Sequence, residues 1–121
     1  MIAVTFALPA ESSRFVRRLS NKSRSARNGI QTVRGKISNR EVAVLHTGVG
    51  EKACRRRLEK FLQDQQFDCL ISAGFAGALN DELRVGDLLL ARNFSVIELN
   101  DKQTAFGSLQ IRVADLLTVP G

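Results

Sequence analysis

Three short segments carry residues that could do chemistry, and each follows a predicted strand. Glu11 comes shortly after the apolar run IAVTFAL, Gly48-Val49-Gly50 follows VAVLHT, and the small residues 73–78 follow CLIS. The carboxyl ends of parallel strands meet at one edge of an open α/β sheet, and ligands bind there. We therefore predict that the three segments build one ligand site.

Glu11 is the candidate catalytic residue. A carboxylate that follows a buried strand can have a raised pKa and act as a general acid or base. The structural alternative is an acidic residue in the first turn of a helix, where it favours the helix macrodipole. The local sequence alone leaves both interpretations open.

The two small-residue segments are candidate backbone sites. Gly48-Val49-Gly50 precedes a predicted helix, so its N–H groups could approach a polar or anionic ligand. A dinucleotide fingerprint would need a glycine at Ala53, and no GxxxxGK[ST] phosphate loop occurs. The backbone of 73–78 could hydrogen-bond a planar heterocycle. Tight turns and close packing are the structural alternatives for both segments.

The remaining reactive residue types argue against a metal site or a nucleophilic dyad. His46 ends a predicted buried strand, and we interpret it as a packed or hydrogen-bonded histidine. Cys54 lies on the apolar stripe of a predicted helix, and Cys69 begins a second strand, 69–72, that we also expect to be buried. Two distant cysteines and one histidine give neither a disulfide framework nor a zinc site. We expect no metal and no cofactor.

The elements that must position these residues are those of an α/β protein. Apolar residues 2–8 predict a buried strand that ends at Pro9, and helical periodicity begins at Glu11. Residues 20–29 are polar and turn-rich, which favours a mobile loop. Further along the chain we expect a hairpin at 31–37 and 41–46, a helix at 51–64, strands at 69–72 and 85–91, a strand at 95–99, and an extended or helical piece at 108–117. The order strand, helix, strand over 41–72 predicts a parallel βαβ unit.

Composition and charge limit the class of protein. The 121 residues are 44% hydrophobic and 25% charged, values typical of one globular domain. No apolar run approaches the ~20 residues of a membrane span. The N-terminus lacks the basic segment of a secretory signal, and the two cysteines fit a cytoplasmic protein. Residues 1–60 hold 14 Lys and Arg against four acids, but the absence of Trp and Tyr argues against nucleic-acid binding and favours a solvated basic face.

Together these segments resemble the N-terminal half of the nucleoside phosphorylase superfamily. The likeness is closest to its methylthioadenosine/S-adenosylhomocysteine nucleosidase branch. It covers roughly residues 1–92 and rests on four pieces in order: Glu11 after the first strand, 47–50 before a helix, 72–79, and Arg84-Val85-Gly86-Asp87. The resemblance implies a three-layer α/β fold with a mixed central sheet. Residues 1–121 would then form a single incomplete domain whose C-terminal half is missing.

The resemblance also implies hydrolysis of the N-glycosidic bond of a purine nucleoside, with water as the nucleophile. Glu11 matches the carboxylate that positions and deprotonates that water. The implied substrate-binding residues line the sugar and the base: Leu8, Val49, Gly50, Phe75, Ala76 and Gly77.

Some positions depart from the family pattern. Ser72 stands where the phosphorolytic branch has a phosphate-binding arginine, and Phe75 replaces a family serine that hydrogen-bonds near the nucleophile. Between Ser95 and Gly121 nothing matches the family's Met-Glu pair, which binds the ribose, or its purine-protonating aspartate.

We expect a fragment, a truncated reading frame or one part of a two-chain assembly, with a homo-oligomer or a complementing chain as partner. The alternative is a non-catalytic remnant of the fold that binds nucleosides or oligomerises.

Overall fold

The computed structural model describes residues 1–77, 79, 82–95, 104–106 and 109–117. The chain divides into two compact units, residues 1–76 and 77–121, which we describe separately.

The first unit is built on a five-stranded mixed sheet with the order β2-β3-β4-β1-β5. Its elements are β1 (Ile2–Phe6), α1 (Pro9–Arg17), β2 (Ser20–Arg27), β3 (Ile30–Ile37), β4 (Arg40–His46), α2 (Glu51–Leu62) and β5 (Cys69–Ser72). Strand β1 runs parallel to both of its neighbours, with Phe6 opposite His46 on β4 and Thr5 opposite Ser72 on β5. Strands β2 and β3 are antiparallel additions on the β4 side.

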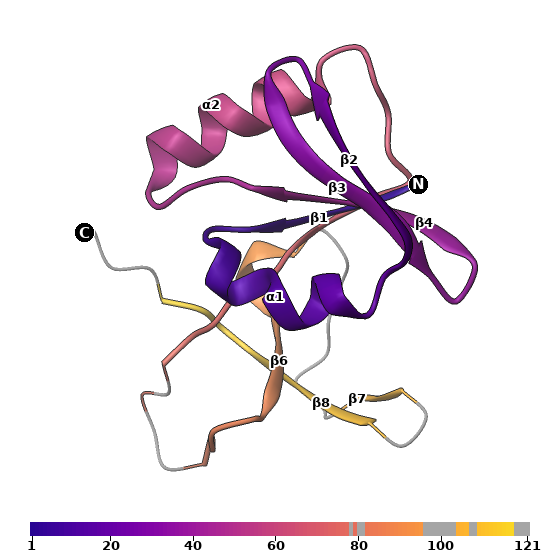
Figure 1. Ribbon diagram of the computed structural model, residues 1–121. Coiled ribbons are helices and arrows are strands. Elements are labelled where there is room, and N and C mark those ends of the chain that lie inside the picture. The colour runs from indigo at the N-terminus through magenta and orange to yellow at the C-terminus, as the bar shows by residue number, and fades with distance from the viewer. Residues whose placement is uncertain (78, 80–81, 96–103, 107–108, 118–121) are drawn as a thin grey trace. The chain divides into compact units, whose positions relative to one another are not determined.

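The two helices cover opposite faces of this sheet (Figure 1). Val4 and Val44 face α1 and pack with its residue Phe15. Ala3 and Leu45, which alternate with them along the strands, face α2 and pack with Phe61. Because both faces are covered, β1 and β4 have near-continuous apolar sequences rather than alternating ones. This arrangement confirms the predicted three-layer α/β fold with a mixed sheet.

Helix α1 begins directly after β1. Leu8, in an extended conformation, is its N-cap, and Pro9 occupies the start of the helix, where proline's fixed φ and missing N–H are tolerated. Glu11 lies in the first turn of α1. The strand itself ends at Phe6, so the apolar run up to Leu8 extends past it as the connection to the helix.

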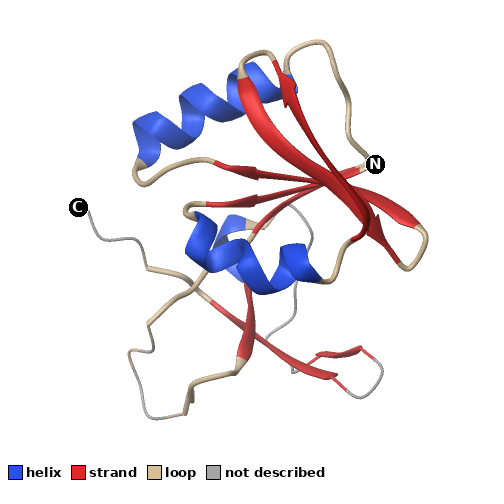
Figure 2. Ribbon diagram, viewed as in Figure 1, coloured by secondary structure: helices blue, strands red, loops and turns tan. Residues whose placement is uncertain are grey.

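The predicted loop at 20–29 is wrong, because most of it forms strand β2 (Figure 2). It pairs antiparallel with β3 through a turn at Asn28-Gly29, whose φ angles are 50° and 80°. Positive φ at both central residues is the requirement of a type I′ hairpin turn, which the Asn-Gly pair meets. Strand β2 is polar because it lies at the edge of the sheet and most of its residues are exposed. The predicted hairpin between β3 and β4 is confirmed.

The prediction of a βαβ unit over 41–72 is confirmed for the direction of its two strands, but the strands are not neighbours in the sheet. Strands β4 and β5 are parallel, but β1 lies between them. The expectation that β5 is a buried strand is wrong: all four of its residues are exposed, with Leu70 at 45% and Ile71 at 46%. Strand β5 is the edge strand on that side of the described sheet, so its outer side has no partner strand.

The β2–β3 turn also stabilises the end of α2. Arg27 donates hydrogen bonds to the carbonyl oxygens of Phe61 (3.1 Å) and Gln63 (2.7 Å), and Asn28 donates to that of Lys60 (2.8 Å). These carbonyls lie at the C-terminus of the helix, where they have no partner within the helix itself. The turn therefore caps α2 from a distant part of the sequence.

Arg27→Ala is expected to lower the free energy of unfolding by about 1–2 kcal/mol, because two carbonyls at the helix end lose a charged donor. Urea denaturation monitored by circular dichroism measures this change. Lys22→Ala is the matched control on the same strand, since Lys22 is exposed. Equal stability of the two variants would contradict the capping role of Arg27.

The second unit contains a three-stranded sheet with the order β6-β8-β7. Its elements are β6 (Leu88–Ala91), the short helix η1 (Arg92–Phe94), β7 (Thr104–Phe106) and β8 (Leu109–Ala114). The strand predicted at 85–91 begins only at Leu88, because Arg84 and Asp87 close a turn with bonds of 2.9 and 3.0 Å. The piece predicted at 108–117 is extended as β8, and most of the strand predicted at 95–99 lies outside the described residues.

Candidate active site

The carboxyl ends of β1, β4 and β5 meet at one edge of the first unit. Backbone pairing continues beyond the strands: Thr47 N–H donates to the Phe6 carbonyl (2.9 Å), and Gly48 N–H donates to the Ala7 carbonyl (3.0 Å). On the other side of β1, Ala73 N–H donates to the Thr5 carbonyl (2.8 Å). The segments 8–11, 47–50 and 73–76 therefore leave the sheet side by side, as the sequence predicted.

The side chain of Glu11 extends from α1 to the turn that follows β5. Its Oε2 accepts a hydrogen bond from the backbone N–H of Phe75 at 3.2 Å. A Cβ atom at Gly74 would lie 2.6 Å from the same oxygen, so glycine is what lets the carboxylate come this close. Among the described residues, no hydrogen bond to Oε1 is present. One oxygen of the half-buried carboxylate is thus anchored, and the other can accept a bond from a ligand or water.

The remaining predicted site residues of the first unit have exposed positions at this edge. Leu8 precedes Glu11, and Val49, with 72% of its surface exposed, lies in the turn after β4. Gly50 is the N-cap of α2 with φ of 98°, a conformation that favours glycine. Phe75 is 82% exposed, and Ala76 ends the unit. Gly77 belongs to the second unit, so its position relative to Glu11 is not described.

A polar bridge next to Glu11 was not predicted. The Ser12 hydroxyl is 2.7 Å from His46 Nε2 and donates to the Pro9 carbonyl at 3.1 Å. On the other side, Arg57 Nε–H donates to the His46 carbonyl at 2.8 Å. His46 is hydrogen-bonded, as predicted. We expected the basic residues of the N-terminal half to form a solvated face. Arg57 departs from this expectation, because its side chain is half-buried against the end of β4.

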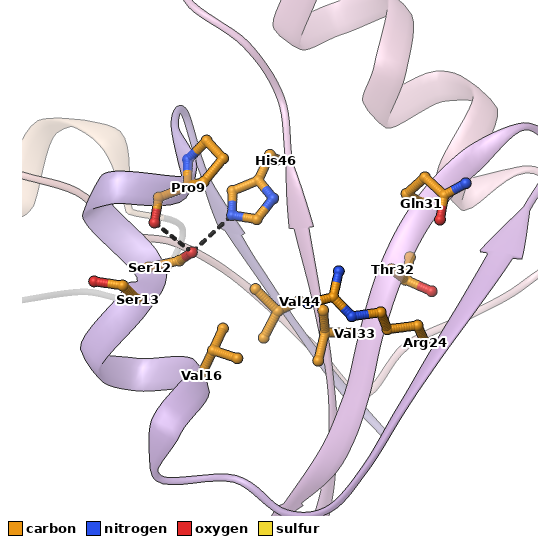
Figure 3. A pocket seen from close by; sticks show the side chains of 10 residues that line it. All are labelled: Pro9, Ser12, Ser13, Val16, Arg24, Gln31, Thr32, Val33, Val44 and His46. Atoms are coloured by element: carbon orange, nitrogen blue, oxygen red, sulfur yellow. Dashed lines mark hydrogen bonds between the residues drawn. The ribbon is translucent and has the colours of Figure 1, made fainter.

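A groove of about 390 Å³ lies beside this bridge, between α1 and strands β2 to β4 (Figure 3). Ser12 and His46 form its polar end, Val33 and Val44 contribute apolar surface, and Arg24 lies across from α1. Glu11 is not among its lining residues. The groove and the edge that carries Glu11 are therefore adjacent but distinct surfaces.

The pKa of His46 predicts how stability depends on pH. Burial and the positive charge of Arg57 hold this pKa below its usual value of 6.5. Between the folded and unfolded pKa values the unfolded chain binds more protons, so the free energy of unfolding falls as pH drops below about 6.5. Urea denaturation at pH 7.5 and 5.5 should show a larger loss for the wild type than for His46→Gln. Equal losses would contradict the shifted pKa.

The described residues offer no metal site and no membrane span. They contain no group of three or more His, Cys, Asp or Glu side chains that could hold a metal ion. Within the same residues, no helix is long and apolar enough to cross a membrane.

Asp115 of the second unit is paired with Arg92 through two bonds of 3.0 and 3.1 Å, which lower the pKa of its carboxyl group. Asp115 is thus held ionised and does not fit the role of a proton donor.

The first unit is a three-layer α/β unit of the open-sheet class, with a carboxylate and glycine turns at the carboxyl ends of its parallel strands, the edge where ligands bind in proteins of this class. The sequence model of the phosphorylase superfamily matches residues 1–112. The chain therefore belongs to the phosphorylase superfamily, which confirms the resemblance found in the sequence.

Relatives and solved structures agree on one branch of this family. The 5′-methylthioadenosine/S-adenosylhomocysteine nucleosidase of Shewanella sediminis is 28% identical over 107 residues, which are 88% of this chain and 45% of that protein. The nucleosidase of Haemophilus influenzae is 37% identical over 57 residues, which are 47% of this chain and 25% of that protein. The Streptococcus pneumoniae MTA/SAH nucleosidase in complex with 8-aminoadenine superposes with a TM-score of 0.65 at 29% identity, covering 74% of this chain and 40% of that one. The chain thus spans about half the length of the curated relatives it matches.

Proposed function

We propose that this chain supplies the Glu11 side of a site that hydrolyses the N-glycosidic bond of purine nucleosides. The observation that carries the proposal is the Glu11 carboxylate itself. It lies at the edge where three strand ends meet, with Oε2 held by the Phe75 N–H. Its other oxygen has no hydrogen-bond partner among the described residues.

The proposed chemistry needs a group with these properties. Water attacks C1′ of the ribose, and the bond from C1′ to the purine nitrogen breaks with its electron pair passing to the purine. The purine takes up a proton from solvent, and the products are the free purine and the free sugar. Glu11 accepts the proton that the water loses. Its negative charge also stabilises the positive charge that develops on the sugar ring in the transition state. A carboxylate with one oxygen anchored can meet both demands without first reorienting.

Two observations support hydrolysis rather than phosphorolysis. Ser72, at the end of β5, occupies the position where the resemblance places a phosphate-binding arginine in the phosphorolytic branch. Without a guanidinium at that position, a phosphate loses its bidentate partner. The matched relatives from Shewanella and Haemophilus are also named as nucleosidases.

The exposed residues at the same edge suit a purine nucleoside. We assign Leu8 and Val49 to the sugar and its 5′ substituent, because both present apolar side chains beside the strand ends. The turn at 73–76 presents backbone groups, which can hydrogen-bond the edge of a planar base. Gly50, Phe75 and Ala76 complete the proposed set of substrate-binding residues in the first unit. A purine ligand also agrees with the 8-aminoadenine bound to the similar pneumococcal nucleosidase.

A second candidate function is binding of nucleosides, or self-association, without catalysis. The exposed edge strand β5 favours it, since Leu70 and Ile71 remain about half exposed. An unpaired strand edge is a template for pairing with another chain. Under this alternative the partner is a second copy of the chain or a complementing chain in the cytoplasm.

One experiment separates the two functions. The purified chain, alone and mixed with a chain that supplies the missing C-terminal half, is incubated with methylthioadenosine. Free adenine is measured by chromatography, and binding is measured by calorimetry alongside the mass from light scattering. Adenine release above the rate in buffer, in either mixture, supports hydrolysis. Saturable binding or a stable dimer without adenine release in either mixture supports the second candidate. A monomer that neither binds nor cleaves the nucleoside in either mixture overturns both.

A further inference from the structure

We propose that Ser12 and His46 form a positioning pair for the Glu11 carboxylate. This inference rests on the proposed function, since it assigns a role within the same site. Neither residue is among those that the family resemblance assigns to the substrate.

The pair lies next to Glu11, between the first turn of α1 and the end of β4. The Ser12 side chain is only 2% exposed, and its hydroxyl joins the first turn of α1 to the end of β4 through His46. Glu11, the preceding residue, extends instead to the turn after β5, where it accepts the Phe75 N–H. The first turn of α1 is therefore attached to strand ends on both sides of β1. The two attachments come from consecutive residues, so a shift in one moves the other.

The Ser12 hydroxyl has two hydrogen-bond partners, the Pro9 carbonyl of its own helix turn at 3.1 Å and His46 Nε2 at the end of β4 at 2.7 Å. A hydroxyl can donate one bond and accept another, so it can bond to both. Arg57 in turn donates to the backbone carbonyl of His46 and fixes the end of β4 from α2. Elements on both faces of the sheet thus hold the turn that carries Glu11.

The bond between Glu11 and Phe75 fixes one oxygen of the carboxylate but not the backbone that carries the side chain. At 3.2 Å it lies at the long end of the N–H···O range, in an exposed position. A glutamate side chain has several rotamers and loses this contact when its backbone shifts. Because Ser12 is buried, it acts through the position of Glu11 and not by touching a ligand.

The test uses the Phe75 amide as a direct reporter of the Glu11 carboxylate. In ¹⁵N NMR spectra, Glu11→Ala defines the chemical shift and the hydrogen-exchange rate of this amide when the bond is absent. Ser12→Ala is expected to move the shift more than halfway to that reference and to raise the exchange rate roughly tenfold. Ser12→Thr, which keeps the hydroxyl, is expected to stay near the wild type.

Ser13→Ala is the matched control from the same turn. The Ser13 hydroxyl is exposed, and within the described part of the chain its one hydrogen bond goes to the Ala10 carbonyl of the same helix at 3.4 Å. Its Phe75 amide should be unchanged. Where Ser12→Ala does not fold, His46→Ala breaks the same bridge from the strand side and gives the same readout.

The outcomes separate this inference from the proposed function, because the amide readout does not require turnover. A folded Ser12→Ala variant with a wild-type Phe75 amide overturns the positioning role, whatever the activity. A displaced amide, together with no adenine release from the chain either alone or mixed with the missing C-terminal half, supports the positioning role and rejects hydrolysis. In a chain that does release adenine, Ser12→Ala should also lower kcat roughly tenfold with little change in KM.

Discussion

Glu11→Gln is expected to reduce adenine release from methylthioadenosine by about 10²–10⁴-fold, the usual contribution of a general base. The amide keeps the size of the side chain and can still accept the Phe75 N–H through its oxygen. It cannot take a proton from water, and it carries no charge to stabilise the sugar cation. The free energy of unfolding should change by less than about 0.5 kcal/mol, because Glu11 is only half-buried. Adenine release and urea denaturation measure the two effects.

Glu51→Gln is the matched control, since Glu51 is the acidic residue in the first turn of the other helix. It forms an ion pair with the exposed Arg55 at 3.0 Å. If Glu11 serves only the helix macrodipole, the two variants should behave alike, with a stability change of a few tenths of a kcal/mol and unaltered turnover. Equal turnover in the two variants would therefore reject the catalytic assignment of Glu11.

Phe61→Ala is expected to give the largest loss of stability, about 3–5 kcal/mol. Phe61 is 1% exposed and packs against Ala3 and Leu45 of the sheet. Its ring also stacks on that of Phe67, with centroids 5.1 Å apart. Removing the ring leaves a cavity between α2 and the sheet that the rigid strands cannot fill. Urea denaturation monitored by circular dichroism measures the loss.

Phe75→Ala is the same substitution at an exposed position, and it is the control for stability. Its side chain is 82% exposed, so the free energy of unfolding should change by less than about 0.5 kcal/mol. A Phe61→Ala variant as stable as Phe75→Ala would mean that α2 does not pack on the sheet as described.

The elements that the sequence predicts well are those with a face to bury. The apolar run of β1 and the stripe on α2 that ends at Phe61 follow directly from periodicity, because the sheet and the helices cover them. Strand β2 gives no such signal, since an exposed edge strand buries almost nothing. The Asn28-Gly29 pair was the available sign of a hairpin there. Strand β5 gives the opposite error. Its apolar sequence predicts a buried strand, but among the described residues nothing covers it.

The site was predictable as a set of strand ends but not as a set of contacts. Topology alone places Glu11 near the turns at 47–50 and 73–76, because parallel strands end at one edge. The bond to the Phe75 N–H depends on the absence of a side chain at Gly74, which spacing does not reveal. The bridge between Ser12 and His46 joins residues 34 positions apart, and its partners look ordinary in the sequence. Such contacts depend on the packing of α1, which periodicity describes only roughly.

A crystal structure of the chain with methylthio-immucillin-A, a compound crystallised with the nucleosidase of Neisseria meningitidis, would test the position of Glu11 most directly. Our account predicts that the compound lies on the edge formed by residues 8–11, 47–50 and 73–76. The Glu11 carboxylate should then be within about 3 Å of the sugar-like ring or of a water molecule beneath it. A compound bound elsewhere, or a Glu11 side chain turned away from the ring into solvent, would contradict the account.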